Sequence, residues 1–374
     1  MVNKVKLKVA HIGCPYYPYL GGSTKRLSNL ANKIACKDDV EQYLITPSLS
    51  DSKKVDDKYF KCVLRNRKVN NFGYLKEVND FIVLNKIEIV VLHNSRVLLN
   101  WFLFYKLRVS RIKVLVEIHS FRDDSIFKKA VNYFLYRMSD AIVHLSKSSK
   151  DYMAMSYLNN KNHIIYNGIN LNEEKIYSNR YNVDKIKLCY LGSFHDWQGV
   201  NIISENVLKL GLEFWVINEI YLIGDGPELV NVKNKLTPLI DKGANIFIVG
   251  WKGSGYVDEI LKSTDFLLAI RPSTVATETV FPLKIVDSVN FNIPLICTNV
   301  GGLKEKLDEN NAAFFIDKNE QYSLAKFLSN PPSEYDYNKK KNNLSQLTEK
   351  LDTWECSADK YVSLFYSIAS ENKK

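Results

Sequence analysis

The sequence predicts an α/β protein of two Rossmann-like domains followed by C-terminal helices. Short apolar runs alternate with longer amphipathic stretches, the pattern of parallel sheets with helices on both faces. The pattern restarts near residue 185, after a polar stretch at 170–185 with the composition of a linker. We expect domains at 1–172 and 186–345 that face each other across a cleft, and helices at 346–374 that cross back to the N-terminal domain.

Each element of this prediction rests on hydrophobic periodicity. Apolar, β-branched runs predict strands in the first half at 6–13, 88–94, 113–120, 141–146 and 163–168. Leu27, Leu30, Ala31 and Ile34 recur at helical spacing and predict a helix over 23–35, with Ser23 or Thr24 as its N-cap. In the second half we expect strands at 185–194, 220–228, 245–251, 265–270 and 294–300, and helices at 255–263, 283–290 and within 346–371.

Composition restricts the class of protein. Hydrophobic residues make up 46% and charged residues 25%, which is globular composition. No apolar run reaches the roughly 18 residues that span a bilayer, and we expect the start of the chain to be a strand, not a signal peptide. Six scattered cysteines without a CxxC pair predict a reduced, cytoplasmic protein without a zinc ribbon.

The positive charge is concentrated in one half of the chain. The net charge is +10, and residues 1–175 hold 29 Lys and Arg against 16 Asp and Glu, or +13. The other residues hold 22 against 25, or −3. This asymmetry suggests an anionic partner for the N-terminal half: a lipid headgroup surface, a pyrophosphate-linked acceptor or nucleic acid. The alternative is a basic surface that serves solubility alone.

Two glycine-rich turns are weak candidate sites. Gly21 and Gly22 lie between the first strand and first helix, where backbone N–H groups favour an anion, but the segment lacks the GK[ST] ending of a P-loop. A flexible loop is the alternative there. In GDGPEL (224–229), Leu229 stands where a dinucleotide fingerprint has its third Gly, so a tight turn is favoured over a cofactor site.

Strand ends supply further candidates. His119 ends a strand, where open α/β sheets bind ligands and a His can hydrogen-bond a sugar hydroxyl or stabilise charge; His93 is a weaker candidate, and a structural role stays open for both. The densest signal is 271–305, which can cradle a diphosphate sugar. A strand ends at Arg271, a loop carries Glu278 and Thr279, and Phe281, Pro282, Leu283 and Lys284 open a helix that holds Asp287.

These motifs resemble, in their order, the family 4 retaining glycosyltransferases of the GT-B fold. The ordered set comprises the Gly21–Gly22 loop, His119, YNGIN (166–170), GSFHDWQGV (192–200), IGDGPE (223–228) and the 271–305 segment, so the resemblance runs from residue 7 to about 310. It implies transfer of a sugar from a nucleotide-diphosphate sugar to an acceptor hydroxyl, with retained anomeric configuration.

The resemblance also implies roles for single residues. Asp287 stands at the second Glu of the family's E-x7-E motif, which holds the donor ribose, and the first Glu falls at Thr279, next to Glu278. His119 matches the histidine that contacts the donor sugar near its reacting end. Ser193 and Gln198 stand where the family has an Arg and a Lys facing the donor phosphates, and Lys284, Arg271 or Lys252 would replace those charges. Trp251 lies where the nucleotide base packs.

The expected partners follow from the same comparison. The family needs no bound metal, and we expect neither metal nor cofactor. The acceptor is expected to be a glycan or a lipid-pyrophosphate-linked sugar of surface polysaccharide synthesis, bound by the basic N-terminal domain at the inner face of the membrane. Its aromatic residues suit such an acceptor or are core: Tyr16, Tyr17, Tyr19, Trp101, Phe102, Phe104 and Tyr105.

Two other functions stay open. A nucleotide-sugar epimerase of the GT-B superfamily would carry more acidic and histidine groups around the sugar than we find. A non-catalytic protein on a degenerate scaffold would bind carbohydrate or nucleic acid, although no interleaved aromatic and basic motif favours nucleic acid.

Overall fold

The computed structural model describes residues 6–17, 19, 21–47, 58–66, 72–93, 97–121, 125–153, 160–170 and 181–370. Contacts divide the chain into two compact units. The first unit comprises Met1–Gly168, Thr279–Phe281 and Asp352–Lys374, and the second comprises Ile169–Glu278 and Pro282–Leu351. Most of the predicted linker, 171–180, lies outside the described residues, and the cleft between the domains stays a prediction.

The first unit contains a parallel sheet of order β3-β2-β1-β4-β5-β6-β7. Its strands are β1 (Leu7–Ile12), β2 (Val40–Pro47), β3 (Cys62–Asn66), β4 (Ile89–His93), β5 (Lys113–Ile118), β6 (Ala141–His144) and β7 (Asn162–Ile164). Its helices are α1 (Gly22–Ala35), α2 (Phe72–Asn85), α3 (Val97–Val109), α4 (Ile126–Met138), α5 (Lys147–Met153) and α14 (Trp354–Ser370).

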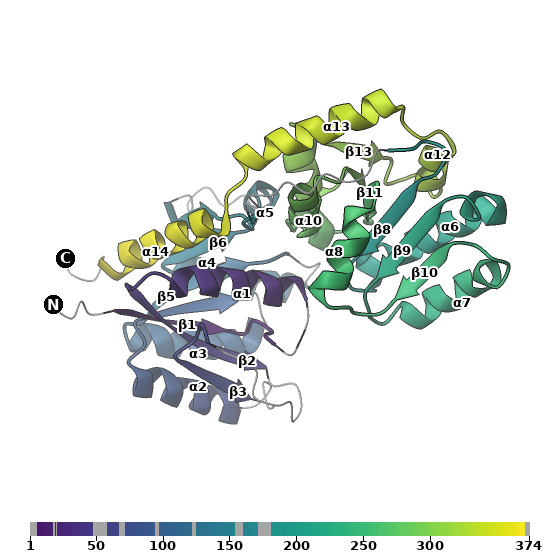
Figure 1. The fold of residues 1–374 in the computed structure, drawn as a ribbon. Coiled ribbons are helices and arrows are strands. Elements are labelled where there is room, and N and C mark those ends of the chain that lie inside the picture. Colours follow the sequence, from purple (N-terminus) through teal and green to yellow (C-terminus); the bar gives the residue numbers. More distant parts are fainter. Residues whose placement is uncertain are drawn as a thin grey trace. The chain divides into compact units, whose positions relative to one another are not determined.

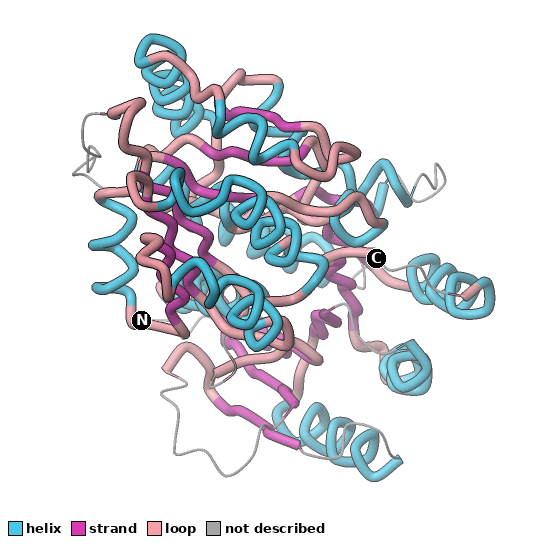
Figure 2. Tube along the Cα trace, turned by 90° about the vertical axis from the view of Figure 1, so that its right-hand side faces the viewer, coloured by secondary structure: helices cyan, strands magenta, loops and turns pink. Residues whose placement is uncertain are grey.

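Burial explains why this sheet is parallel. Every residue of β4, β5 and β6 is buried, which requires helices on both faces. Helices α1 and α14 lie together on one side of the sheet, and α2 and α3 lie on the other (Figure 1). Figure 2 shows strands of the protein with helices to either side of them.

The second unit repeats this architecture with a parallel sheet of order β10-β9-β8-β11-β12-β13. Its strands are β8 (Lys187–Leu191), β9 (Glu219–Ile223), β10 (Ile246–Val249), β11 (Phe266–Ala269), β12 (Leu295–Thr298) and β13 (Ala313–Ile316). Its helices are α6 (Val200–Trp215), α7 (Leu229–Ile240), α8 (Ser254–Lys262), α9 (Val275–Thr279, whose last residue belongs to the first unit), α10 (Lys284–Phe291), α11 (Gly301–Leu303), α12 (Ser323–Ser329) and α13 (Glu334–Leu347), with short turns η2 (Asp196–Gln198), η3 (Lys304–Asp308) and η4 (Thr348–Lys350).

The strand orders confirm the predicted α/β class and locate the ligand edges. In each sheet the chain leaves the first strand toward one side and later returns to its other side, so β1 lies between β2 and β4, and β8 between β9 and β11. Ligands of such sheets bind at the carboxyl ends of the strands at this switch point. His119 follows β5 near the first switch point, and Arg271 follows β11 at the second.

Local details correct the sequence prediction at the start of α1. The helix begins at Gly22, with extended Gly21 as its N-cap and no side-chain cap. Neither Ser23 nor Thr24 caps it, because both lie inside the first turn, and the Thr24 hydroxyl instead donates to the Pro15 carbonyl. Within the described part of the chain, no helix combines the length and apolarity needed to cross a membrane.

Candidate active site

In the second unit, a buried arginine follows β11 at the switch point. Arg271 is 4% exposed, and the Thr298 hydroxyl of β12 holds its backbone through two hydrogen bonds of 2.8 Å. One guanidinium nitrogen, Nη2, donates to Gln198 Oε1 at 2.8 Å, and the guanidinium carbon lies 5.7 Å from the centre of the Trp197 ring. Among the described residues, Nε and Nη1 have no hydrogen-bond partner.

A buried lysine opens α10 close to the end of β8. Lys284 is 7% exposed, and its Nζ lies 3.8 Å from the centre of the Tyr190 ring. The Tyr190 hydroxyl donates to the Ser193 carbonyl, and a Cβ on Gly192 would come within 3.4 Å of Lys284 Cε. The loop after β8 therefore packs against the lysine stem. Lys284 Nζ has no hydrogen-bond partner in the described part of the chain.

The pKa values of both buried cations are lowered. Burial lowers the pKa of Arg271 to about 10. Burial, followed by the charge of Arg271, lowers the pKa of Lys284 well below its ordinary value. Buried charges ordinarily require partners, so the unused N–H groups of these two cations are an arrangement that an anion would complete.

Asp287 lies where it can serve the same ligand. It is half-buried, one turn after Lys284, and residues three apart share a helix face. Ser193 and Gln198 are also half-buried in the loop after β8, so three predicted donor residues, Asp287 included, lie near Arg271 or Lys284. Trp251 and Lys252 lie separately, exposed in the turn after β10, where Lys252 Nζ is 5.6 Å from the centre of the Tyr256 ring.

Glu278, predicted to be catalytic, is bound to a different set of residues. It accepts hydrogen bonds from Lys318 at 2.7 Å, Ser273 at 2.5 Å and the Gly301 N–H at 2.9 Å. Burial raises the pKa of Glu278, but these bonds outweigh it and lower the pKa overall. The carboxylate is thus an ionised acceptor on a cavity of 510 Å³ that it lines with Asn299, Lys304, Lys318 and their neighbours.

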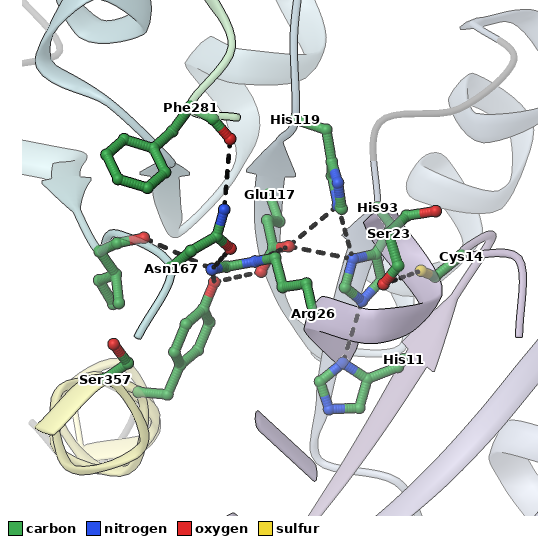
Figure 3. Close-up of polar contacts among 12 residues, drawn as sticks. His11, Cys14, Ser23, Arg26, His93, Glu117, His119, Asn167, Phe281 and Ser357 are labelled. Atoms are coloured by element: carbon green, nitrogen blue, oxygen red, sulfur yellow. Dashed lines mark hydrogen bonds and ion pairs between the residues drawn. The ribbon is translucent and has the colours of Figure 1, made fainter. Parts of the chain in front are cut away.

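Thr279 and Phe281 belong to the first unit and are both buried. The Phe121 N–H donates to Thr279 Oγ1 at 3.0 Å, and the Ser146 hydroxyl donates to the Thr279 carbonyl at 3.1 Å. Asn167 Nδ2 donates to the Phe281 carbonyl at 3.3 Å (Figure 3). Thr279 and Phe281 were predicted to meet the donor, and the polar atoms named here form hydrogen bonds within the first unit. Pro282 is buried and Leu283 half-buried at the start of α10.

The first unit contains a buried polar network that sequence inspection did not predict (Figure 3). Arg26 of α1 donates through Nε to Glu117 Oε1 at 3.0 Å, through Nη1 to Asn167 at 2.7 Å and through Nη2 to Tyr361 of α14 at 3.1 Å. The Tyr361 hydroxyl also donates to Glu117 Oε2. Arg26 is the single charged residue on the buried face of α1, and Glu117 is the single acidic residue of the fully buried β5, so this signal was available in the sequence.

This network determines the state of His119. Burial alone would raise the pKa of Glu117, but Arg26 and His93 hold it well below its ordinary value, so the carboxylate only accepts hydrogen bonds. His119 Nε2 lies 2.9 Å from Glu117 Oε1 and 3.2 Å from His93 Nδ1, and therefore carries the proton. Burial lowers the pKa of His119 and keeps the ring neutral. Its Nδ1 is then left as an acceptor for a ligand hydroxyl.

The same three side chains have the composition of a metal site. Ligand atoms of His93, Glu117 and His119 lie within 4.8 Å of one another. However, Glu117 already accepts from Arg26, whose positive charge 3.0 Å away opposes a second cation on the same oxygen. The expectation that no metal is needed stays a prediction.

The glycines of the second unit serve close packing. Gly224 has φ +147, and a Cβ there would lie 1.8 Å from the Gly192 carbonyl oxygen. The GDGPEL turn thus packs its backbone against the loop after β8, which agrees with a tight turn.

Two family models match the chain, one in each unit. Residues 20–173 match the model described as Glycosyltransferase Family 4, and residues 185–330 match Glycosyl transferases group 1. The chain belongs to glycosyltransferase family 4. Its two parallel sheets agree with the GT-B fold of solved family members, and the protein is a transferase enzyme.

Three relatives illustrate the likeness of this family 4 glycosyltransferase. An uncharacterized glycosyltransferase of Methanocaldococcus jannaschii is 25% identical over 83% of this chain and 84% of its own. Anabaena HepE, solved with UDP and glucose, has a TM-score of 0.75 at 13% identity, covering 96% of this chain and all of that one (100%). WaaG, a glycosyltransferase involved in lipopolysaccharide biosynthesis, has a TM-score of 0.66 at 15% identity, covering 95% and 99%.

The structure shows which side chain meets Gln198, one of the departures of this glycosyltransferase from the family resemblance. Gln198 occupies the place of a lysine, and its side-chain oxygen accepts a hydrogen bond from Arg271. Arg271, from the end of the neighbouring strand β11, thus places a positive charge beside Gln198.

Proposed function

We propose that this glycosyltransferase binds the diphosphate of a nucleotide-sugar donor between Arg271 and Lys284. The observation that supports this most is the unused N–H groups of these two buried cations. A diphosphate supplies the oxygens and the negative charge that both side chains lack. The start of α10 adds backbone N–H groups and a positive helix dipole. Asp287, on the same face as Lys284, would accept the ribose hydroxyls.

The proposed reaction moves the sugar to an acceptor hydroxyl with retained anomeric configuration. As the bond to the sugar breaks, negative charge accumulates on the leaving diphosphate, and Arg271 and Lys284 stabilise it most in the transition state. The leaving phosphate takes the acceptor proton. His119, neutral and with Nδ1 as an acceptor, would bind a hydroxyl of the donor sugar and orient it.

We propose a glycan or lipid-linked acceptor of surface polysaccharide biosynthesis. HepE was solved with UDP and glucose, and WaaG is involved in lipopolysaccharide biosynthesis, which supports a nucleotide-sugar donor and this class of product. The charge of +13 in residues 1–175 supports an acceptor at the anionic inner face of the cytoplasmic membrane.

The test is a binding screen with UDP-, GDP-, ADP- and CDP-sugars, read by thermal shift and calorimetry. One donor class should stabilise the wild type, and Arg271→Met should remove most of that shift. NMR of the product anomer then tests retention. Interconversion of free nucleotide-sugars without an acceptor would indicate an epimerase. A failure of every donor at millimolar concentration would favour a non-catalytic carbohydrate-binding protein.

A further inference from the structure

An apolar stripe runs along the exposed face of α4. Phe127 is 66% exposed and Phe134 is 55% exposed, and Met138 is exposed one turn further on. Their spacing of seven and four positions puts them on one helix face. Leu135 and Tyr136 of the same helix are buried in the core, so the outward phenylalanines do not serve the packing of the unit.

The neighbouring helix extends this surface. Helix α3 contacts α4 and exposes Tyr105 and Val109. Together the two helices carry five cations and no acidic residue: Lys106, Arg108, Lys128, Lys129 and Arg137. Arg108 forms an ion pair with Asp140, which follows α4, at 2.9 Å, so the attraction to anionic headgroups is assigned to the four other cations. We call these exposed apolar and basic residues of α3 and α4 the α3–α4 face. Large apolar side chains beside cations on a helix surface are the composition of an interfacial, membrane-bound helix.

We propose that the α3–α4 face binds the surface of a bilayer that contains anionic lipid. This rests on the proposed function in one respect, namely that a lipid-linked acceptor is reached from the membrane. The phenylalanines enter the boundary between headgroups and acyl chains, and the cations attract the anionic headgroups. The position fits, because His119 follows β5 and α4 is the next helix along the chain, so Phe127 in the first turn lies at the end of α4 nearer that residue.

Vesicle binding of the full-length protein tests this. Sedimentation compares vesicles of phosphatidylcholine with vesicles that also contain phosphatidylglycerol. Wild type should bind the anionic vesicles, and binding should weaken in high salt. Phe127→Ser with Phe134→Ser should lower the partition coefficient at least about tenfold, because each lost phenylalanine removes its burial in the boundary region. Lys128→Gln with Lys129→Gln should weaken binding to anionic vesicles alone.

A matched control uses apolar residues that are just as exposed elsewhere. Val83 and Leu84 of α2 are 62% and 82% exposed, and Val83→Ser with Leu84→Ser should leave vesicle binding unchanged. The proposal is overturned if wild type does not bind anionic vesicles at low salt, or if the phenylalanine variant binds like wild type. It is also overturned if the stripe joins two copies, so that wild type is a dimer and the phenylalanine variant a monomer.

Donor binding in the absence of vesicles separates this inference from the proposed function. Retained donor binding with no vesicle binding would refute the membrane surface alone. Vesicle binding that depends on the phenylalanines, without any donor binding, would support the surface and refute the proposed donor site.

Discussion

Replacing Lys284 with methionine should move stability and donor binding in opposite directions. The buried ammonium lies over the Tyr190 ring without a hydrogen bond to any described group, so the free protein carries a desolvation cost that the methionine variant lacks. Removing the buried charge should raise the free energy of unfolding of the free protein by about 1–2 kcal/mol. For a unit of this size, that raises Tm by about 2–8 °C.

The same substitution should weaken donor binding. The lost charge-assisted hydrogen bonds to the diphosphate are worth about 1.5–3 kcal/mol. Donor affinity should therefore fall about 10- to 150-fold by calorimetry. The pH dependence follows from linkage. Because the pKa of Lys284 is lowered in the folded protein, the unfolded state binds more protons, and wild-type stability decreases as pH falls below the unfolded pKa of about 10.4. The methionine variant should lack this loss.

Lys252→Met is the matched control. It makes the same chemical change at an exposed lysine that also lies near a tyrosine ring. Its Tm and donor affinity should stay close to wild type. A Lys284→Met protein that melts earlier than wild type and binds donor equally well would show that the lysine is structural, and would refute the argument for an anion site.

Three further predictions concern other parts of the protein. Glu117→Gln should destabilise the first unit by about 3–5 kcal/mol, because it leaves the Arg26 charge buried without its partner. Since the pKa of Glu117 is lowered on folding, its stabilisation is present above the unfolded pKa of about 4.3 and lost as pH falls further, so the Gln variant should show a shallower acid transition by circular dichroism. Gly199→Ala should lower the free energy of unfolding in urea by about 3 kcal/mol or more, since φ is +80 and a Cβ would lie 1.6 Å from a backbone oxygen. Gly211→Ala is the control, because φ is +75 there but no atom lies near the added Cβ, and it should cost about 1–2 kcal/mol. Equal losses in the two variants would contradict the clash at Gly199. Chelators should leave transferase activity unchanged, and a divalent-ion requirement that His93→Ala abolishes would instead make the histidine and glutamate cluster a metal site.

Periodicity predicted the fold well and the site in part. Strands such as β4 and β5 are apolar throughout, so their type and order follow from local sequence. The structure also has strands that we did not predict, including β2, β3 and β13. Glu41 and Gln42 interrupt the apolar residues of β2, whereas β13 is apolar throughout (AFFI), so its signal was present in the sequence.

Long-range pairing explains what the sequence did not reveal. Arg271 was expected to replace a lost charge, but its hydrogen bond to Gln198 joins residues from two different strand ends. Arg26, Glu117 and Tyr361 come from three elements far apart in the chain, and no spacing rule connects them. The aromatics that were expected to meet an acceptor or to be core divide between these roles: Tyr16 and Phe104 are core, Tyr17 is half-buried, and Tyr19 and Tyr105 are exposed. The side chains of Trp101 and Phe102 lie outside the described residues.

The location of α14 has a consequence for biosynthesis. This last helix belongs to the first unit, where Tyr361 completes the buried shell around Arg26 and Glu117. The ribosome releases the whole second unit before it releases α14, so the unit that is started first is finished last. A nascent chain that stops before residue 354 lacks the Tyr361 side chain that covers the Arg26–Glu117 ion pair. A truncation at the C-terminus would therefore leave the N-terminal unit incompletely folded and exposed to cellular quality control.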